Sequence, residues 1–216
     1  MPPVCELDRV TKRYGDRLVL DQMSLTVHKG EMVAITGKSG SGKSTILNII
    51  GMLENPDEGR VKLFGEDAPR SHSRKANQIL RSRISYLFQN FALIDNATVD
   101  KNLEVPLIYA KKSKKEKEQL KKEALQKVGL KIPLSQKVHA LSGGEQQRVA
   151  IARILLKPCE LILADEPTGS VDAENRKEIM GILKGLNKEG KTIIIVTHDP
   201  VVAEACDRVI HLPEKS

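Results

Sequence analysis

One glycine-rich stretch has the residue types and the spacing of a phosphate cradle. It runs Gly37-Lys38-Ser39-Gly40-Ser41-Gly42-Lys43-Ser44-Thr45 and matches the pattern G-x-x-x-x-G-K-[ST]. Glycines allow successive backbone N–H groups to turn toward one concavity, and the positive end of a following helix also attracts anions. Lys43 would reach the β- and γ-phosphates, the Ser44 hydroxyl would ligate Mg²⁺, and Thr45 would face the α-phosphate. The stretch therefore predicts a nucleoside triphosphate site.

The segments on either side of this stretch support that interpretation. Residues 32–35 are short and apolar enough for a buried strand, and residues 46–50 continue as a helix. A strand, a glycine loop and a helix form the context in which the pattern marks a nucleotide site. The alternative is a glycine-rich turn that only caps the helix.

A pair of carboxylates follows a second apolar run. Residues 161–164 lead directly into Asp165 and Glu166. Because α/β sheets bind ligands at the carboxyl ends of their strands, we expect Asp165 to hold Mg²⁺ through water. Glu166 would polarise a water in line with the γ-phosphate. The pattern also fits a strand that meets a solvated loop, so its meaning depends on its pairing with the glycine stretch.

A third motif places two glycines in the first turn of a helix. Ser142 and Glu145 match the S-x-x-E capping box, so a well-capped helix is one explanation. Gly143 and Gly144 each cost about 1 kcal/mol of helix stability relative to alanine, yet they leave bare backbone that a phosphate could approach. Because one chain cannot readily present two helix N-termini to one γ-phosphate, the motif indicates a site that a second chain completes.

Composition limits the classes of partner. The net charge of +7 would suit nucleic acid or an anionic membrane, but aromatic residues make up only 3% and Trp is absent, which argues against base stacking on an aromatic platform. Residues 111–127 hold eight lysines and three glutamates around a narrow apolar stripe. This arrangement favours a solvated helix face over a surface for lipid or nucleic acid. The stripe comprises Leu120, Ala124, Leu125 and Val128.

The cysteines and the apolar runs bear on location. Cys5, Cys159 and Cys206 are far apart and form no C-x-x-C pair, which is typical of buried thiols in a reducing compartment. The first residues have no basic region followed by an apolar one, so we expect no signal peptide. No apolar run approaches the roughly 18 to 20 residues of a membrane span. We expect a cytosolic protein unless a partner holds it at a membrane.

The order of the remaining elements predicts an α/β fold. Short runs before residue 36 that alternate apolar and polar residues, together with residues 59–65, predict antiparallel strands. The β-branched run at 192–197 does not alternate, which is typical of a parallel sheet covered on both faces. Other strands are expected at 84–88, which ends at Gln89, and at 161–164 and 208–212. Helices are expected at 73–83, 111–127 and 173–188, and another opens at 96–100, with Leu103, Val105, Leu107 and Ile108 available for packing.

These motifs, in this order, resemble the nucleotide-binding subunit of an ATP-binding cassette (ABC) transporter over nearly all 216 residues. The resemblance implies an α/β P-loop NTPase fold with a mixed sheet core, an N-terminal antiparallel β-subdomain and an inserted α-helical subdomain. It implies one ABC ATPase domain, 1–216. Residues 1–89 and 160–216 would form the nucleotide-binding core, and 90–159 the helical signature subdomain.

The resemblance also assigns roles in the site. Tyr14 would stack on the base, with an ordinary strand tyrosine as the alternative. Gln89 would contact Mg²⁺ and the attacking water, although its position alone indicates only a polar loop residue. His198 would sense the γ-phosphate and orient Glu166, although it could simply cap the next helix. The signature that acts on the second chain would comprise Leu141, Ser142, Gly143, Gly144, Glu145 and Gln146, and the dimer-contact loop Ser170, Val171 and Asp172.

Partners and activity follow from the same resemblance. ATP bound by one subunit would be covered by the signature of the other in a head-to-tail homodimer, and hydrolysis would drive an integral membrane permease, with two copies expected, that docks near residues 89–110. The amino-acid sequence and spacing of residues 90–94 and 98–107 resemble those of the branch of MacB and lipoprotein-releasing (LolD-like) ATPases, which includes antimicrobial-peptide exporters. This implies an ATPase with ATP and Mg²⁺ as cofactors, at the cytoplasmic face of the cell membrane and without a nucleic-acid partner.

Two other functions compete with export. One is a membrane regulator ATPase of the FtsE type, which does not transport. The other is a soluble ABC ATPase that acts on nucleic acid or ribosomes. Such soluble chains usually carry two cassettes, a long coiled-coil insertion or zinc motifs, and this sequence shows none of them.

Overall fold

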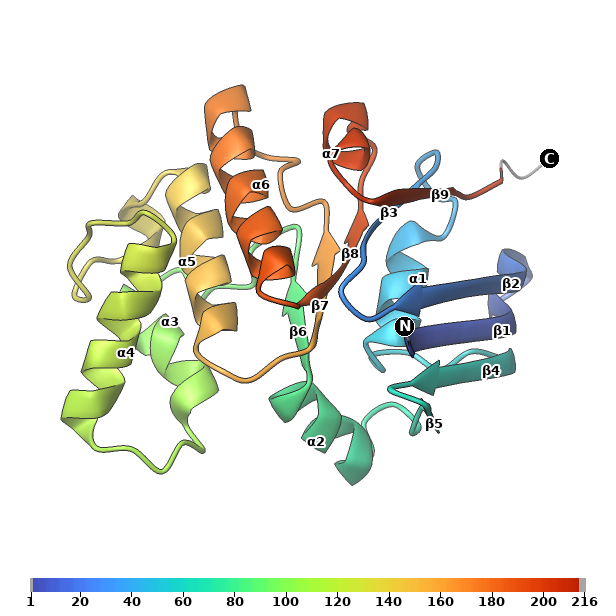
Figure 1. Cartoon of the computed structure of the whole chain (residues 1–216), viewed down its shortest axis with the longest axis horizontal. Helices are drawn as coiled ribbons and strands as arrows, with labels where there is room; N and C mark the ends of the chain where they lie inside the picture. The colour runs from blue at the N-terminus through green and yellow to red at the C-terminus, as the bar shows by residue number, and fades with distance from the viewer. Residues whose placement is uncertain (1, 214–216) are drawn as a thin grey trace.

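The strands of the chain are divided between two sheets, which lie side by side in the computed structural model (Figure 1). The structure describes residues 2–213. The antiparallel sheet has the order β2-β1-β4-β5 and is formed by β1 (Pro3–Tyr14), β2 (Arg17–His28), β4 (Glu58–Leu63) and β5 (Glu66–Asp67). The parallel sheet has the order β6-β7-β8-β3-β9 and is formed by β6 (Ile84–Leu87), β7 (Leu161–Asp165), β8 (Thr192–Val196), β3 (Met32–Thr36) and β9 (Arg208–His211). The antiparallel and parallel strands predicted from the sequence thus lie in two separate sheets.

Helices cover both faces of the parallel sheet. Helix α1 (Lys43–Ile50) follows β3, and α2 (Arg74–Ser82) precedes β6. Between β6 and β7 lie α3 (Val99–Glu104), α4 (Lys114–Lys127) and α5 (Gly143–Leu155), with 3₁₀ turns at Val105–Leu107 and Val138–Ala140. Helices α6 (Ala173–Lys188) and α7 (Pro200–Glu204) follow β7 and β8. The predicted helix at 173–188 is confirmed at both ends, whereas the division into subdomains at 90 and 159 stays a prediction.

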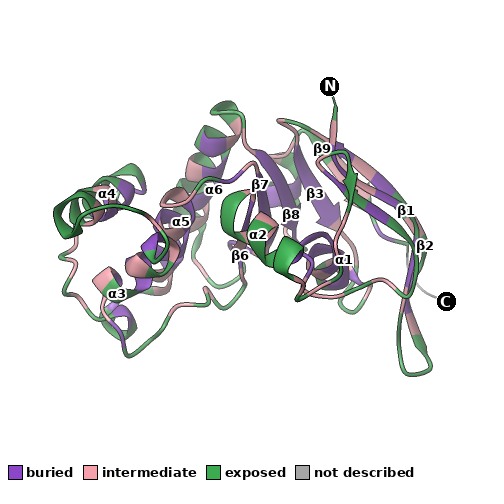
Figure 2. Cartoon of the chain, turned by 90° about the horizontal axis from the view of Figure 1, so that it is seen from below, coloured by how far each residue is buried: buried purple, intermediate pink, exposed green. Residues whose placement is uncertain are grey.

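Two hydrophobic cores share the parallel sheet, one on each face. The core next to α1 and the antiparallel sheet contains Leu161, Leu163, Ile194 and Val196. The core next to α5 and α6 contains Ile162, Ala164, Ile193 and Ile195. Successive strand residues point to opposite faces, so a strand covered on both sides must be apolar throughout. Figure 2 shows the result, with β3, β7 and β8 buried between layers that expose residues only on their outer sides.

Parallel pairing brings the predicted chemical residues to one edge of the sheet. Strands β6, β7, β8 and β3 run in the same direction, so the loops that follow them leave from the same edge. The loop after β3 contains the glycine stretch, and the loops after β6, β7 and β8 contain Gln89, Glu166 and His198. This is the edge at which α/β sheets bind their ligands.

The packing predicted for Val105 and Ile108 is wrong. Helix α3 ends at Glu104 because Pro106 has no backbone N–H to continue it, and the chain turns into a 3₁₀ segment. Leu103 and Leu107 are buried as predicted, but Val105 and Ile108 are 46% and 59% exposed. The turn therefore places two apolar side chains on the surface.

The lysine-rich helix α4 is a solvated face, with one exception. Lys121 is 4% exposed, and its Nζ lies 2.8 Å from Asp100 Oδ1 and 2.6 Å from Glu104 Oε2, both on α3. Lys117 also contacts Glu104, at 2.7 Å. Hydrogen bonds from Lys117 and then Lys121 hold the pKa of Glu104 below its usual value. The expectation of a merely solvated lysine face is wrong for Lys121, which ties α4 to α3.

Replacement of Lys121 tests whether its ion pairs with α3 stabilise the fold. Lys121→Met should lower the free energy of unfolding by about 1–2 kcal/mol at pH 7, less than for a fully buried pair because both carboxylates are partly exposed. The control is Lys122→Met, whose pair with Glu118 is exposed on both sides and should change stability by less than about 0.5 kcal/mol. Since the pKa of Glu104 is lowered by folding, its contribution is present above its unfolded pKa and is lost as the pH falls through the folded one. Equal effects of both substitutions in urea unfolding would contradict the assignment.

Candidate nucleotide-binding site

Helix α1 has the one α-helical N-terminus without a side-chain cap within residues 2–213. Its N-cap is Gly42, which has no side chain to accept the first backbone N–H groups. The other six α-helices begin at capping residues whose side chains accept such a bond: Ser73, Thr98, Ser113, Ser142, Asp172 and Asp199. An uncapped helix N-terminus is a ready site for an anion.

The loop before α1 is shaped so that only glycine fits at its end. Gly42 has a φ of 99°, in the left-handed region. A Cβ there would lie 2.7 Å from Leu20 Cδ2 and 3.0 Å from the Val19 carbonyl oxygen, so β2 packs directly on the loop. Within the described chain the Ser41 hydroxyl is buried without a hydrogen-bond partner. A buried polar group without a partner fits a cradle whose missing partner is phosphate.

Lys43 curls back over the same loop. Its Nζ donates to the carbonyl oxygens of Gly37 at 2.8 Å and Lys38 at 2.9 Å. Among the described residues it forms no ion pair, so its charge is available to phosphate oxygens. Arg17, which the sequence did not single out, donates to the Gly40 carbonyl at 3.3 Å and holds the outer side of the loop.

Two of the three predicted magnesium ligands, Ser44 and Asp165, lie in contact. Ser44 Oγ donates to Asp165 Oδ1 at 3.2 Å, which joins the start of α1 to the end of β7. Burial raises the pKa of Asp165, the Ser44 hydrogen bond opposes that rise, and the charge of Glu166 adds to it. Within residues 2–213 no three His, Cys, Asp or Glu side chains are grouped so that they could hold a metal ion by themselves. One carboxylate and one hydroxyl still fit Mg²⁺, which takes its other ligands from phosphates and water.

Glu166 sits in a strained backbone conformation and is held by two side chains. Its φ is 45°, which is uncommon for a residue other than glycine and recurs at functional sites. Its Oε1 lies 2.8 Å from His198 Nδ1, and its Oε2 accepts from Thr197 Oγ1 at 3.2 Å. The structure therefore brings Glu166 and His198 together. Thr197 was missed, although it ends the β-branched run directly before His198.

Gln89 follows β6 and so lies at the same edge of the sheet as the other predicted site residues. It does not contact the glycine loop, Asp165 or Glu166. It is exposed in a turn after β6, and its side chain forms no hydrogen bond with the part of the chain that the structure describes. Two and three positions further along the chain, Phe91 and Ala92 have φ values of 61° and 46°. Arg153 of α5 donates to both of their carbonyl oxygens. The role of Gln89 at Mg²⁺ stays a prediction.

Tyr14 ends β1 with a half-exposed ring. Its hydroxyl donates to Glu54, which also accepts from Asn48 of α1 at 2.8 Å. Lys12 Nζ lies 5.6 Å from the ring centroid. The hydroxyl end is thus anchored to α1, and stacking of the ring on a base stays a prediction.

The signature helix α5 is capped by its own side chains. Ser142 Oγ accepts from the Glu145 amide at 3.3 Å, and Glu145 Oε2 accepts from the Ser142 amide at 2.8 Å, which confirms the capping box. Gly144 has an intramolecular reason that the sequence did not reveal, because a Cβ there would lie 2.1 Å from Asn175 Oδ1 on α6. A Cβ on Gly143 would lie 3.5 Å from the Ser170 carbonyl oxygen, an ordinary contact. Asp172 caps α6 through the Asn175 amide at 2.8 Å.

The phosphate cradle and the signature lie on opposite faces of the parallel sheet. Helix α1 packs in the core with the antiparallel sheet, and α5 packs in the core with α4 and α6. Figure 1 shows α1 and α5 separated by the strands of the parallel sheet. Ser142 therefore does not cover the glycine loop of its own chain.

Comparison with known proteins identifies the family. The family model described as ABC transporter matches residues 20–169, more than half of the chain. The chain belongs to the ABC transporter family. It is an ATPase of that family and binds ATP, and the residues of the glycine stretch lie within the matched range.

Two curated relatives match over most of this ABC cassette. The ABC transporter ATP-binding protein YvrO of Bacillus subtilis (strain 168) is 46% identical over 210 residues, which cover 95% of this chain and 92% of YvrO. The macrolide export ATP-binding/permease protein MacB of Shigella flexneri is 42% identical over 216 residues. These cover 98% of this chain but 33% of MacB, so the chain spans about a third of the length of that relative.

Two solved structures share the fold. The dimeric structure of MJ0796, a bacterial ABC transporter cassette, has a TM-score of 0.89 and 41% identity, and the match covers 96% of this chain and 94% of that one. CbiO1 of Clostridium perfringens, part of the ABC transporter complex CbiONQ, has a TM-score of 0.85 and 30% identity, with 97% and 84% covered. In residues 2–213 no helix is both long enough and apolar enough to cross a membrane.

Alanine in place of each signature glycine tests the packing of α5 on α6. Gly144→Ala should lower the free energy of unfolding by about 1–2 kcal/mol, because the added methyl group displaces Asn175 from Asp172 and Arg148 despite the gain in helix propensity. Gly143→Ala, which has room for the methyl group, should be neutral or stabilising. The double variant Gly144→Ala/Asn175→Ala should recover part of the loss in urea unfolding, and a purely additive result would count against this contact.

Glu166→Gln tests the acid–base role of this residue. The amide keeps the shape and can keep one contact with Thr197 or His198, but it cannot accept a proton, so kcat should fall by about two orders of magnitude or more. ATP affinity, measured by equilibrium binding, should stay within a few-fold, whereas Lys43→Ala should abolish it. Normal turnover by Glu166→Gln would remove Glu166 from the catalytic role.

Proposed function

We propose that this ABC ATPase energises a membrane exporter of the MacB type through an ATP-driven head-to-tail homodimer. The observation that carries the proposal is the placement of the cradle and the signature on opposite faces of one sheet. A chain with this geometry can cover a bound triphosphate only with the Ser142 end of another copy. The dimeric MJ0796 structures, one of which holds ADP and Pi, support this arrangement.

The described residues supply the parts of an ATP-hydrolysing site. The amides of the glycine loop and the start of α1, together with Lys43, would bind the triphosphate. Ser44 and Asp165 would hold Mg²⁺, which neutralises charge on the phosphates when bound. Glu166 would take the proton of the attacking water, with its carboxylate oriented by Thr197 and His198.

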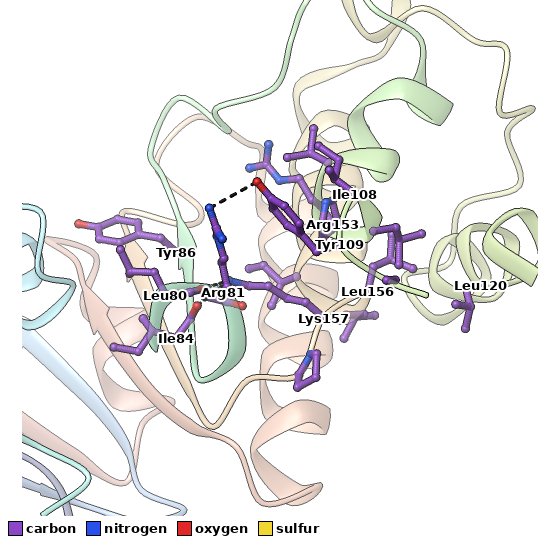
Figure 3. Close-up of a pocket in the computed structure, with 18 of the residues that line it drawn as sticks. Leu80, Arg81, Ile84, Tyr86, Ile108, Tyr109, Leu120, Arg153, Leu156 and Lys157 are labelled. Atoms are coloured by element: carbon purple, nitrogen blue, oxygen red, sulfur yellow. Dashed lines mark hydrogen bonds between the residues drawn. The ribbon is translucent and has the colours of Figure 1, made fainter. Parts of the chain in front are cut away.

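The export function draws on the relatives. Proteins named macrolide export ATP-binding/permease protein MacB match nearly the whole chain, which supports an exporter ATPase held by a permease at the cytoplasmic face of the membrane. We place the permease contact at a groove between α2, the 3₁₀ turn after α3 and the C-terminal end of α5 (Figure 3). This narrows the region expected from the sequence, residues 89–110, to its end at 105–110 and adds walls from α2 and α5.

Mixing two inactive variants tests the shared site. Lys43→Ala disables the cradle of one protomer, and Ser142→Arg blocks the helix tip of the other. In a head-to-tail dimer a mixed pair keeps one intact site, so an equimolar mixture should recover about a quarter of wild-type ATPase activity if the sites act independently. Sites completed within one chain would recover none. Circular dichroism of each variant controls for folding.

A further inference from the structure

Gln147 is buried between the signature helix and the turn that carries Glu166. It lies in the second turn of α5, five positions after Ser142, and is 1% exposed. Its Nε2 donates to the carbonyl oxygen of Pro167 at 2.7 Å. Pro167 directly follows Glu166 in the chain. One amide side chain therefore joins α5 to the loop after β7.

Half of the Gln147 amide has no partner. Its Oε1 is buried, and among the described residues it accepts no hydrogen bond. Turning the amide over would not help, because the Pro167 carbonyl is itself an acceptor and requires the nitrogen to face it. A buried polar atom without a partner costs stability, whereas an apolar side chain of similar volume would fill the same space without that cost. Core packing alone therefore does not account for an amide at this position.

The turn that receives the hydrogen bond has a strained backbone. Glu166 has a φ of 45°, although a residue before proline is ordinarily confined to extended conformations. Such a conformation persists only where its surroundings fix it. The Glu166 amide donates to the Val196 carbonyl of β8 at 2.9 Å, and the Glu166 carbonyl accepts from the Gly169 amide at 3.1 Å. The bond from Gln147 to the Pro167 carbonyl adds a third restraint, which comes from α5.

We propose that Gln147 is a positioning residue for Glu166, whose hydrogen bond to the Pro167 carbonyl holds the strained turn in the conformation that catalysis needs. The inference rests on the proposed catalytic role of Glu166 and adds a residue that acts through it. Gln147 restrains the backbone beside Glu166, while Thr197 and His198 contact the carboxylate itself. Without the amide, the backbone can relax and carry the carboxylate away from these two side chains. A displacement of about 1 Å can lower a catalysed rate by about a hundredfold.

A purely structural role for Gln147 gives a different expectation. The amide would then only satisfy a buried carbonyl oxygen, and its loss would reduce the fraction of folded chains. The chains that still fold and bind ATP would hydrolyse it at the normal rate. The rate for each ATP-binding chain therefore separates the two roles.

Gln147→Met tests the positioning role because it keeps the volume and removes the donor. We expect kcat for ATP hydrolysis, divided by the number of chains that bind ATP, to fall by about tenfold or more. KM and the equilibrium affinity for ATP should stay within about twofold, because the glycine loop and α1 pack in the other core. The control is Val149→Ala on the same helix, which removes fully buried atoms and lowers stability without touching the turn. Its kcat should stay within about twofold of the wild type.

A double variant tests whether Gln147 acts through Glu166. In Glu166→Gln the carboxylate is already absent, so its position no longer affects the rate. The residual hydrolysis by Glu166→Gln/Gln147→Met, measured in a single turnover, should therefore lie within about twofold of that by Glu166→Gln alone. Two losses that multiply would show that Gln147 acts on another part of the site, and would overturn the inference.

The remaining outcomes separate this inference from the role of Glu166. A normal kcat in Gln147→Met, or an equal loss of kcat in Val149→Ala, overturns the positioning role and leaves Glu166 as the proposed base. Normal turnover by Glu166→Gln overturns both. If Gln147→Met fails to fold, Gln147→Asn replaces it, since its amide is one methylene group too short to keep the bond to Pro167 and should show the same loss of kcat.

Discussion

Parallel strands need cover on both faces, and that requirement organises this molecule. Apart from a polar residue at one end of each, strands β3, β7 and β8 are apolar because they are shared by two cores. Their common direction sends the loops after them to one edge. The glycine loop, Asp165, Glu166 and His198 converge there although they come from distant parts of the sequence. The same two-sided cover places α1 and α5 on opposite faces. One constraint thus gathers the residues of the candidate nucleotide site at one edge and separates them from the signature, which we propose completes the site of another copy.

The N-terminal capping of α1 differs from that of the other described α-helices, and the difference bears on function. Six α-helices in the described chain have a Ser, Thr or Asp side chain as their N-cap, whereas α1 has no side-chain cap. Its first residue, Lys43, instead donates to carbonyl oxygens of the glycine loop. Helix α5 combines both devices, since Ser142 and Glu145 satisfy its first amides while the glycines keep its tip free of bulk. The contrast is the reason to expect that α1 binds an anion by itself and that α5 acts only as a cover.

Much of the site followed from the sequence because it depends on local order. A strand, a glycine loop and a helix are contiguous, and the helix at 173–188 and the unbroken β-branched strand at 192–196 are encoded in their own residues. Two of the misses, at Lys121 and Gly144, concern partners distant in sequence, and the one at Val105 concerns a local turn. Lys121 is buried because α3 offers two carboxylates, and Val105 is exposed because the 3₁₀ turn leaves it uncovered. The reason for Gly144 was missed as well, since it lies in Asn175, 31 positions along the chain.

The close approach of Gly144 to Asn175 has a further mechanical result. Asn175 is bonded to Asp172 and Arg148, so the beginnings of α5 and α6 are fastened to each other through one amide side chain. These bonds restrain the distance between Ser142 and the loop before α6. A molecule that docks on both would therefore lose little entropy to ordering on this side.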